Sequence, residues 1–202
     1  MVAKPVGVAI SVPNDTAVNI CDFAGQNELD IVFHNWTSLF TVTEEGCGVT
    51  IPDLQDSVIL YNACDDIQKT ITYSINDGCS SASAIRTFIA TGDHNPPAVT
   101  GTLPQDTICE GGLLPIPATD ISELELLGIT VNDNCTPDMD IQLSNEDIPD
   151  TAEITRLYIL EDLCGNRDTI RQIFILIPGP EIFDLTADSY CENDPDQGTI
   201  QL

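Results

Sequence analysis

The sequence predicts a mainly β protein built from two small β-sandwiches in tandem. Three observations carry this prediction: short β-branched runs, cysteine residues that recur at a near-constant interval, and a composition that supports a folded core. The chain has 202 residues, of which 42% are hydrophobic, so it is not a disordered acidic tail. It has no apolar run near the roughly 20 residues that a membrane-spanning helix needs.

The net charge excludes several classes of function. Lys and Arg total 6 and Asp and Glu total 33, which gives a net charge of -27. Binding to nucleic-acid phosphates depends on clustered Lys and Arg, so we expect no nucleic-acid partner and no anionic membrane partner. No strong catalytic motif is present, and acidic pairs such as Asp65-Asp66 read as a solvated face. We therefore expect a protein that is not an enzyme.

The chain repeats itself. Segment 77–89 matches segment 162–174 at an offset of 85 without a gap, with Asp, Cys, Ile and Arg identical at matching positions. Three pairs of cysteine residues are in register at offsets of 85 or 88, namely Cys79 and Cys164, Cys21 and Cys109, and Cys47 and Cys135. We expect a first unit over about 4–93, a second over about 94–179, and a truncated third over 180–202.

Short runs rich in β-branched residues, separated by Gly, Pro, Asn and Asp, predict the strands. In the first unit they are Val6–Ser11, Leu39–Val42, Gly48–Ile51, Ser57–Tyr61, Lys69–Ile75 and Ala84–Thr91. In the second unit they are Ala98–Thr102, Gly128–Val131, Asp140–Ser144, Ile154–Leu160 and Thr169–Ile177. Strands at this spacing, in units of this size, are typical of an immunoglobulin-like sandwich.

One segment of the first unit has helical periodicity. Its apolar residues fall at i, i+3, i+4, i+7 and i+11, namely Leu29, Val32, Phe33, Trp36 and Phe40. We expect an inserted helix over about 26–40, laid across the sandwich. An aromatic stripe at this spacing is usually core, although Trp36 with its neighbours is also the residue set that a carbohydrate platform would use. A shorter helix over 121–127, N-capped by Asp120, is its expected counterpart in the second unit.

Eight widely spaced cysteine residues indicate an oxidising, extracellular compartment. No CxxC pair occurs and only two His are present, which argues against a zinc site. Reduced thiols in a cytosolic protein are the alternative. Because no signal peptide follows Met1 and the sequence reaches Leu202 in what reads as a strand, we expect a piece of a longer, secreted protein.

The immunoglobulin-like topology predicts which cysteine residues pair. It brings the loop between the second and third strands next to the loop between the last two strands, at one end of the sandwich. Cys47 and Cys135 lie in the former loop, and Cys79 and Cys164 in the latter. The expected disulfides are Cys47–Cys79 and Cys135–Cys164.

The opposite end of the first unit supplies the remaining pair. Cys21 follows the first strand and Cys64 precedes the last hairpin, so we expect a Cys21–Cys64 disulfide. A Cys47–Cys64 pair is the alternative. The second unit has Pro149 where Cys64 would recur. The cysteine residues left without an expected local partner are Cys109 and Cys191.

A family resemblance follows from the loop motifs. Asp133-Asn134-Cys135, Ile154-Thr155-Arg156 and Asp162-Leu163-Cys164-Gly165-Asn166 together resemble the hyalin-repeat-like (HYR-like) modules of large bacterial surface proteins. The first unit resembles a variant with a helix inserted after its first cysteine, but it has Asp77-Gly78-Cys79-Ser80-Ser81 in place of Cys-Gly-Asn. Such modules occur in tandem in gliding-motility adhesins. The resemblance, over about 4–179, implies an immunoglobulin-like fold, an extracellular adhesive or spacer role and no catalytic residues.

The linker between the units suggests calcium. It reads Gly92-Asp93-His94-Asn95-Pro96-Pro97 and resembles the linkers of calcium-rigidified tandem domains. Hard oxygen ligands on Asp-rich loops bind Ca²⁺. We expect Asp93 and Asn95 to converge with Asp133 and Asp162 around one ion. The alternative is that these residues only form turns.

Together these observations predict a non-catalytic structural or adhesive repeat segment of a secreted cell-surface adhesin. It would act as a spacer stiffened by disulfides and by Ca²⁺, with neighbouring repeats, surface polysaccharide or protein as its partners. Two alternatives remain. One is a carbohydrate- or protein-binding module, which an exposed aromatic patch would favour. The other is an accessory domain of a secreted hydrolase.

Overall fold

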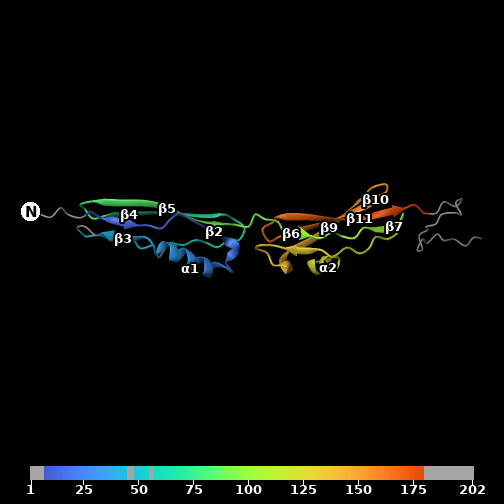
Figure 1. Cartoon of the computed structure of the whole chain (residues 1–202), viewed down its shortest axis with the longest axis horizontal. Helices are drawn as coiled ribbons and strands as arrows, with labels where there is room; N and C mark the ends of the chain where they lie inside the picture. The colour runs from blue at the N-terminus through green and yellow to red at the C-terminus, as the bar shows by residue number, and fades with distance from the viewer. Residues whose placement is uncertain (1–6, 45–47, 55–56, 180–202) are drawn as a thin grey trace, which may run out of the picture. The chain divides into compact units, whose positions relative to one another are not determined.

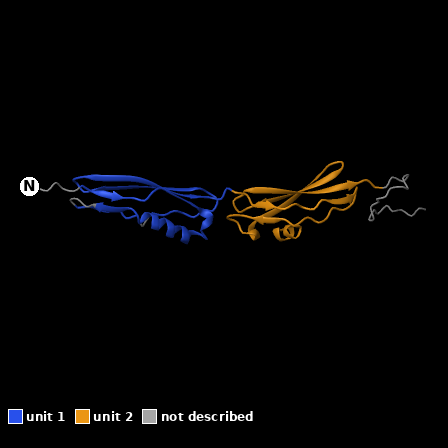
Figure 2. Cartoon of the chain, viewed as in Figure 1, with its two compact units in different colours: residues 1–94 blue, residues 95–202 orange. Residues whose placement is uncertain are grey.

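The computed structural model describes residues 7–44, 48–54 and 57–179. The chain separates into two compact units, with the division between His94 and Asn95 (Figure 2). This is one residue after the boundary that the sequence predicts. The protein is mainly β, with several separate sheets. The expected third unit over 180–202 lies outside the described residues.

In its described residues, the first unit contains two sheets, one helix and one 3-10 turn (Figure 1). In chain order its elements are β1 (Ala9–Ser11), β2 (Thr16–Asn19), η1 (Ile20–Asp22), α1 (Gln26–Thr37), β3 (Thr41–Glu44), β4 (Ile67–Asn76) and β5 (Ser81–Thr91). Strand β1 pairs antiparallel with β3. The other sheet has the order β2-β5-β4, in which β4 and β5 form a long antiparallel hairpin and β2 runs parallel to β5.

Helix α1 forms within the segment where apolar spacing predicts a helix, and it ends before Phe40. Its buried side chains build an aromatic core: the Phe33 ring lies edge-on to Phe88 of β5 with centroids 5.3 Å apart, and Trp36 lies edge-on to Phe40 at 5.2 Å. Trp36 is only 5% exposed, and its Nε1 donates to the carbonyl of Asn14 at 2.9 Å. The expected core role of Trp36 is therefore confirmed.

Segment 57–61 has the composition of a strand, but it is not one in the structure. Helix α1 begins beside it. Gln26 Nε2 donates to the Ile59 carbonyl at 2.8 Å, and Gln26 Oε1 accepts from the Tyr61 N–H at 2.7 Å. The side-chain amide thus satisfies two backbone groups that a neighbouring strand would otherwise pair. The predicted strand Gly48–Ile51 is likewise irregular.

The second unit also contains two sheets (Figure 1). Its elements are β6 (Ala98–Thr100), β7 (Asp106–Cys109), α2 (Ile121–Leu126), β8 (Thr130–Asn132), η2 (Asp138–Asp140), β9 (Gln142–Pro149), β10 (Glu153–Glu161) and β11 (Arg167–Ile177). Strands β6 and β8 pair antiparallel. The larger sheet has the order β7-β11-β10-β9, with β7 parallel to β11. Both sheets and α2 contribute to one core, through residues such as Val131, Tyr158 and Leu124.

The two units share a pairing pattern. In each, a long hairpin, β4–β5 or β10–β11, is extended by a four-residue strand that runs parallel to its second strand. Sequence patterns missed both short strands, β2 and β7. The units differ at the other edge, where β9 pairs with β10 but no described strand pairs with the corresponding edge of β4.

Equivalent tyrosine residues in the two hairpins have different surroundings. Tyr158 Oη accepts from the Ala118 N–H at 3.2 Å. Tyr73 lies at the matching position, is fully buried, and its hydroxyl has no hydrogen-bond partner among the described residues. Burial also raises the pKa of the Tyr73 phenol. A buried hydroxyl without a partner is destabilising, so the two units differ in how well the same residue fits.

We predict opposite effects for the same substitution at these two positions. Tyr73→Phe removes an unsatisfied hydroxyl and should leave the first unit unchanged or about 1 kcal/mol more stable. Tyr158→Phe leaves the Ala118 N–H without its acceptor and should destabilise the second unit by about 1–2 kcal/mol. Urea unfolding of each variant measures both effects. Equal losses at the two positions would contradict this assignment.

A buried arginine joins β10 to β9. Arg156 is 2% exposed, and its Nε and Nη2 donate to the two carboxylate oxygens of Asp147 at 2.7 and 2.9 Å. Its Nη1 donates to the Pro115 carbonyl at 2.7 Å, and its guanidinium lies 5.2 Å from the Phe174 ring centroid. The hydrogen bonds that Arg156 donates to Asp147 raise the pKa of Arg156. All three nitrogen atoms of the planar guanidinium therefore donate hydrogen bonds.

Lysine should not replace this arginine. Arg156→Lys loses the two-pronged contact and the carbonyl contact, so we expect it to destabilise the second unit by about 2–4 kcal/mol. Arg167 provides the matched control, since it pairs with Glu161 across the same sheet but is 63% exposed. Arg167→Lys should change stability by less than about 1 kcal/mol. Chemical unfolding compares the two variants, and similar values would refute the buried role.

Candidate functional site

One local turn recurs before the cysteine residues. Five of the six described cysteine residues are preceded, two positions earlier, by an Asp or Asn whose Oδ1 accepts from the cysteine N–H at 2.8–3.1 Å. The pairs are Asn19 and Cys21, Asn62 and Cys64, Asp77 and Cys79, Asp133 and Cys135, and Asp162 and Cys164. Such turns fix the backbone on which the cysteine sits. The three Asp residues belong to the sequence motifs described above, whereas the two Asn residues belong to none of them.

None of the described cysteine residues is free. All six are disulfide-bonded, namely Cys21, Cys64, Cys79, Cys109, Cys135 and Cys164. Within the described part of the chain, two pairs of cysteine residues lie at disulfide distance. Cys109, for which the sequence offered no local partner, is therefore bonded as well. Cys47 and Cys191 lie outside the described residues, and the individual pairings stay predictions.

The last residues of the first unit form hydrogen bonds with loop 62–66. Gly92 donates its N–H to Asp66 Oδ1 at 2.9 Å, and Asp93 donates its N–H to a backbone carbonyl of the loop at 2.7 Å. A Cβ on Gly92 would lie 2.7 Å from loop backbone atoms, so only glycine fits there. His94 Nε2 also contacts Asp66 Oδ1, at 2.9 Å. The hydrogen bonds from Gly92 and His94 lower the pKa of the Asp66 carboxyl.

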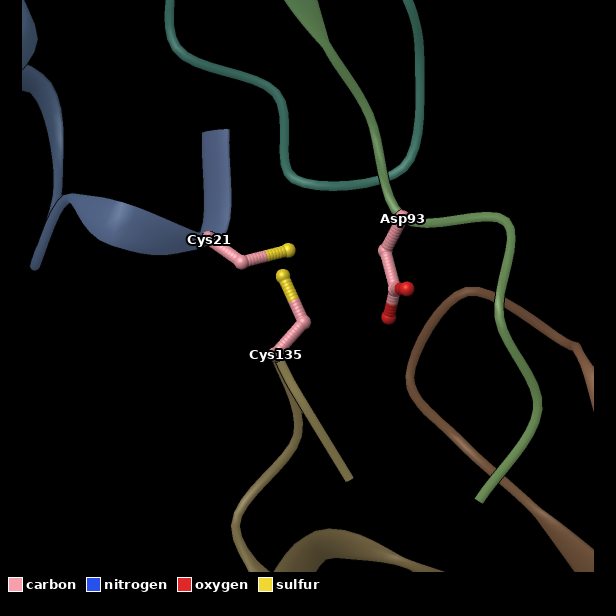
Figure 3. Close-up of side chains that lie close together, drawn as sticks. All are labelled: Cys21, Asp93 and Cys135. Atoms are coloured by element: carbon pink, nitrogen blue, oxygen red, sulfur yellow. The ribbon is translucent and has the colours of Figure 1, made fainter. Parts of the chain in front are cut away.

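Asp93 is the most deeply buried of the expected calcium ligands, at 1% exposure. Within the first unit, one of its carboxylate oxygens lies within 4.8 Å of the Cys21 sulfur (Figure 3). Because Cys21 is disulfide-bonded, its sulfur carries no thiolate charge and is not a metal ligand. The Asp93 carboxylate is therefore the hard ligand that the first unit offers at its end.

The second unit brings two of the expected ligands together. Carboxylate oxygens of Asp133 and Asp162 lie within 4.8 Å of each other. Asp162 is 3% exposed and accepts from the Cys164 and Asn166 N–H groups and from Asn166 Nδ2, each at 2.8 Å. Asp133 Oδ1 accepts two backbone N–H groups, whereas its Oδ2 is buried and has no hydrogen bond within the described residues.

Two adjacent carboxylates repel each other and cannot hydrogen-bond to one another while both are ionised. A bound hard cation would relieve this repulsion and contact the free oxygen of Asp133, and calcium takes oxygen ligands of this kind. The other two expected ligands are not part of this pair. Asn95 is exposed, and Asp93 belongs to the first unit. Their convergence with Asp133 and Asp162 stays a prediction.

No model of a known protein family matches this sequence. A comparison with curated proteins likewise found no match. The resemblance to hyalin-repeat-like modules therefore rests on the sequence motifs alone and stays a prediction. None of the described helices is long and apolar enough to cross a membrane.

The recurring turn predicts how Asp77 tolerates substitution. Asp77→Ala removes the acceptor of the Cys79 and Ser80 N–H groups and should destabilise the first unit by about 1–3 kcal/mol. Asp77→Asn should retain most of the stability, because Asn19 and Asn62 make the same turn. Urea unfolding under oxidising conditions compares the variants. If Asn is as damaging as Ala, the negative charge rather than the turn matters.

Proposed function

We propose that this chain is a non-catalytic repeat segment of a secreted cell-surface adhesin, in which immunoglobulin-like modules act as a spacer. The observation that carries the proposal is that each unit buries its own small core and that all the described cysteine residues are disulfide-bonded. Small domains bury little apolar surface, and secreted ones compensate with such cross-links. Disulfide-bonded cysteine residues also support an extracellular location.

The charge and the core fit a spacer better than a binding module. A net charge of -27 keeps a long repeat protein soluble. The aromatic residues that a carbohydrate platform would use are instead buried, with Phe33 fully enclosed and Trp36 at 5% exposure. No aromatic side chain is among the large hydrophobic residues exposed in the described part of the chain. This removes the main sequence argument for the rival binding function.

Calcium is part of the proposal. Asp133 and Asp162 would supply its carboxylates from the second unit, and the linker residues Asp93 and Asn95 would add further oxygens. Ca²⁺ takes six to eight oxygen ligands, so the pair in the second unit needs such additions. When bound, the ion would neutralise the adjacent carboxylates and restrict the linker. Disulfides and the ion would then stiffen the spacer at different points.

Thermal unfolding in millimolar Ca²⁺ or in chelator tests the metal, because a ligand that binds only the folded state raises the melting temperature. We expect Ca²⁺ to raise it in the natural protein. Asp133→Asn and Asp162→Asn should abolish most of this rise while retaining the turn before each cysteine. Asp150→Asn, in the β9–β10 turn, is the matched control and should respond normally. An equal melting temperature in Ca²⁺ and chelator would refute the calcium site.

Reductant tests the spacer separately from the metal. We expect reduction to lower the melting temperature of both units in chelator, because the cross-links restrict the unfolded chain. Counting free thiols in protein prepared under oxidising conditions provides the direct check. Reactive thiols at all positions would contradict the extracellular proposal, whatever the calcium result.

A further inference from the structure

In the described part of the first unit, one edge of the long strand β4 has no partner strand. In the second unit, β10 pairs with β11 on one side and with β9 on the other. In the first unit, β4 pairs with β5 through all ten of its residues, and no described strand lies on its other side. The segment that corresponds to β9 is 57–64, and part of it bonds to Gln26 at the start of α1 instead. Within the described ranges, the hairpin β4–β5 therefore has no equivalent of the fourth strand that pairs with its counterpart.

The unpaired edge of β4 has few of the features that normally prevent an edge strand from pairing with another chain. Natural edges are short, bulged, or marked by proline and charge. The edge strands β2 and β7 have four residues each, and β9 ends at Pro149 and carries Glu146 and Asp147. Strand β4 has ten residues in unbroken register with β5, with Lys69 as its only charged residue. It is a ready template for another strand.

The charge of the hairpin indicates which kind of partner can approach the β4 edge. Segment 67–91 contains Lys69, Arg86 and one acidic residue, Asp77, so its formal charge is 2 − 1 = +1 within a chain of -27. Asp77 is 6% exposed. The outer face of β4 is uncharged, with exposed Gln68, Thr70, Thr72, Ser74 and Asn76. Two copies of an acidic chain repel each other over most of their surface, but not along this hairpin.

We propose that two copies of this chain associate through their β4 edges, antiparallel and about a two-fold axis. Symmetric pairing lets each outward N–H and C=O of one β4 bond to the same strand of the other copy, which joins two three-stranded sheets into one. The contact places no carboxylate of one β4 against a carboxylate of the other. The proposal is independent of calcium and of the adhesin assignment.

Sedimentation and native-state hydrogen exchange test this pairing together. We expect the protein to shift from monomer toward dimer as its concentration rises, and more so in about 0.5 M NaCl, where repulsion is screened. In an antiparallel pair, alternate N–H groups point away from the partner. Every second amide between Ile67 and Asn76 should therefore exchange fast in the monomer and become protected in the dimer. The amides of β10, paired on both sides, are the internal control.

Two substitutions on the same sheet face separate an edge contact from a face contact. Thr72 on β4 stands opposite Ile85 on β5, and both side chains are exposed. Thr72→Glu places a carboxylate at the edge of each copy and should weaken dimerisation at least tenfold. Ile85→Glu adds the same charge one strand further away and should weaken it much less. Equal effects of the two variants overturn edge pairing, as does a monomer with open β4 amides at all concentrations and salt levels.

Discussion

The hydrogen bond from a cysteine N–H to the side chain two residues earlier is the constraint on which the loops of this protein depend. A disulfide forms without strain only when its two Cβ atoms are already close and well oriented. An Asp or Asn turn sets the backbone of each such cysteine locally, before any distant contact is made. Loops built in this way can hold small sheets together although their cores are modest.

The two units show how one pattern of strand pairing tolerates different surroundings. Both have a long hairpin extended by a short parallel strand. In the second unit, a fourth strand and a buried arginine complete the sheet and its core. In the first unit, α1 contributes aromatic rings to the core. Its first residue, Gln26, hydrogen-bonds to segment 57–64, which corresponds to β9 but does not pair with β4. Among the described residues, the Tyr73 hydroxyl then has no hydrogen-bond partner, and one edge of β4 has no strand paired with it.

The sequence predicts the parts of this fold that depend on local pattern. The two hairpins, both helices and the burial of Trp36 follow from periodicity, capping and composition. Strands β2 and β7 escape prediction because each is four residues long and pairs with a strand far along the chain. Segment 57–61 has strand composition, but a tertiary contact with Gln26 decides its state, which no local pattern encodes.

The expected calcium ligands also differ in how far the sequence predicts their positions. The approach of Asp133 to Asp162 is expected from two loops that an immunoglobulin-like sandwich topology would place at the same end of a unit. The burial of Asp93 depends on the close contact of Gly92 with loop 62–66. This is a tertiary contact that no local sequence pattern encodes. The immunoglobulin-like assignment remains an inference from pattern and resemblance.

The placement of the basic residues has a consequence for resistance to proteolysis. All Lys and Arg residues in the described part of the chain lie within strands, namely Lys69, Arg86, Arg156, Arg167 and Arg171. Proteases of the trypsin type cut after these residues and need the peptide released from its sheet. Their cleavage of the folded units is thus limited by local unfolding, because none of the loops in the described part of the chain contains a Lys or Arg residue.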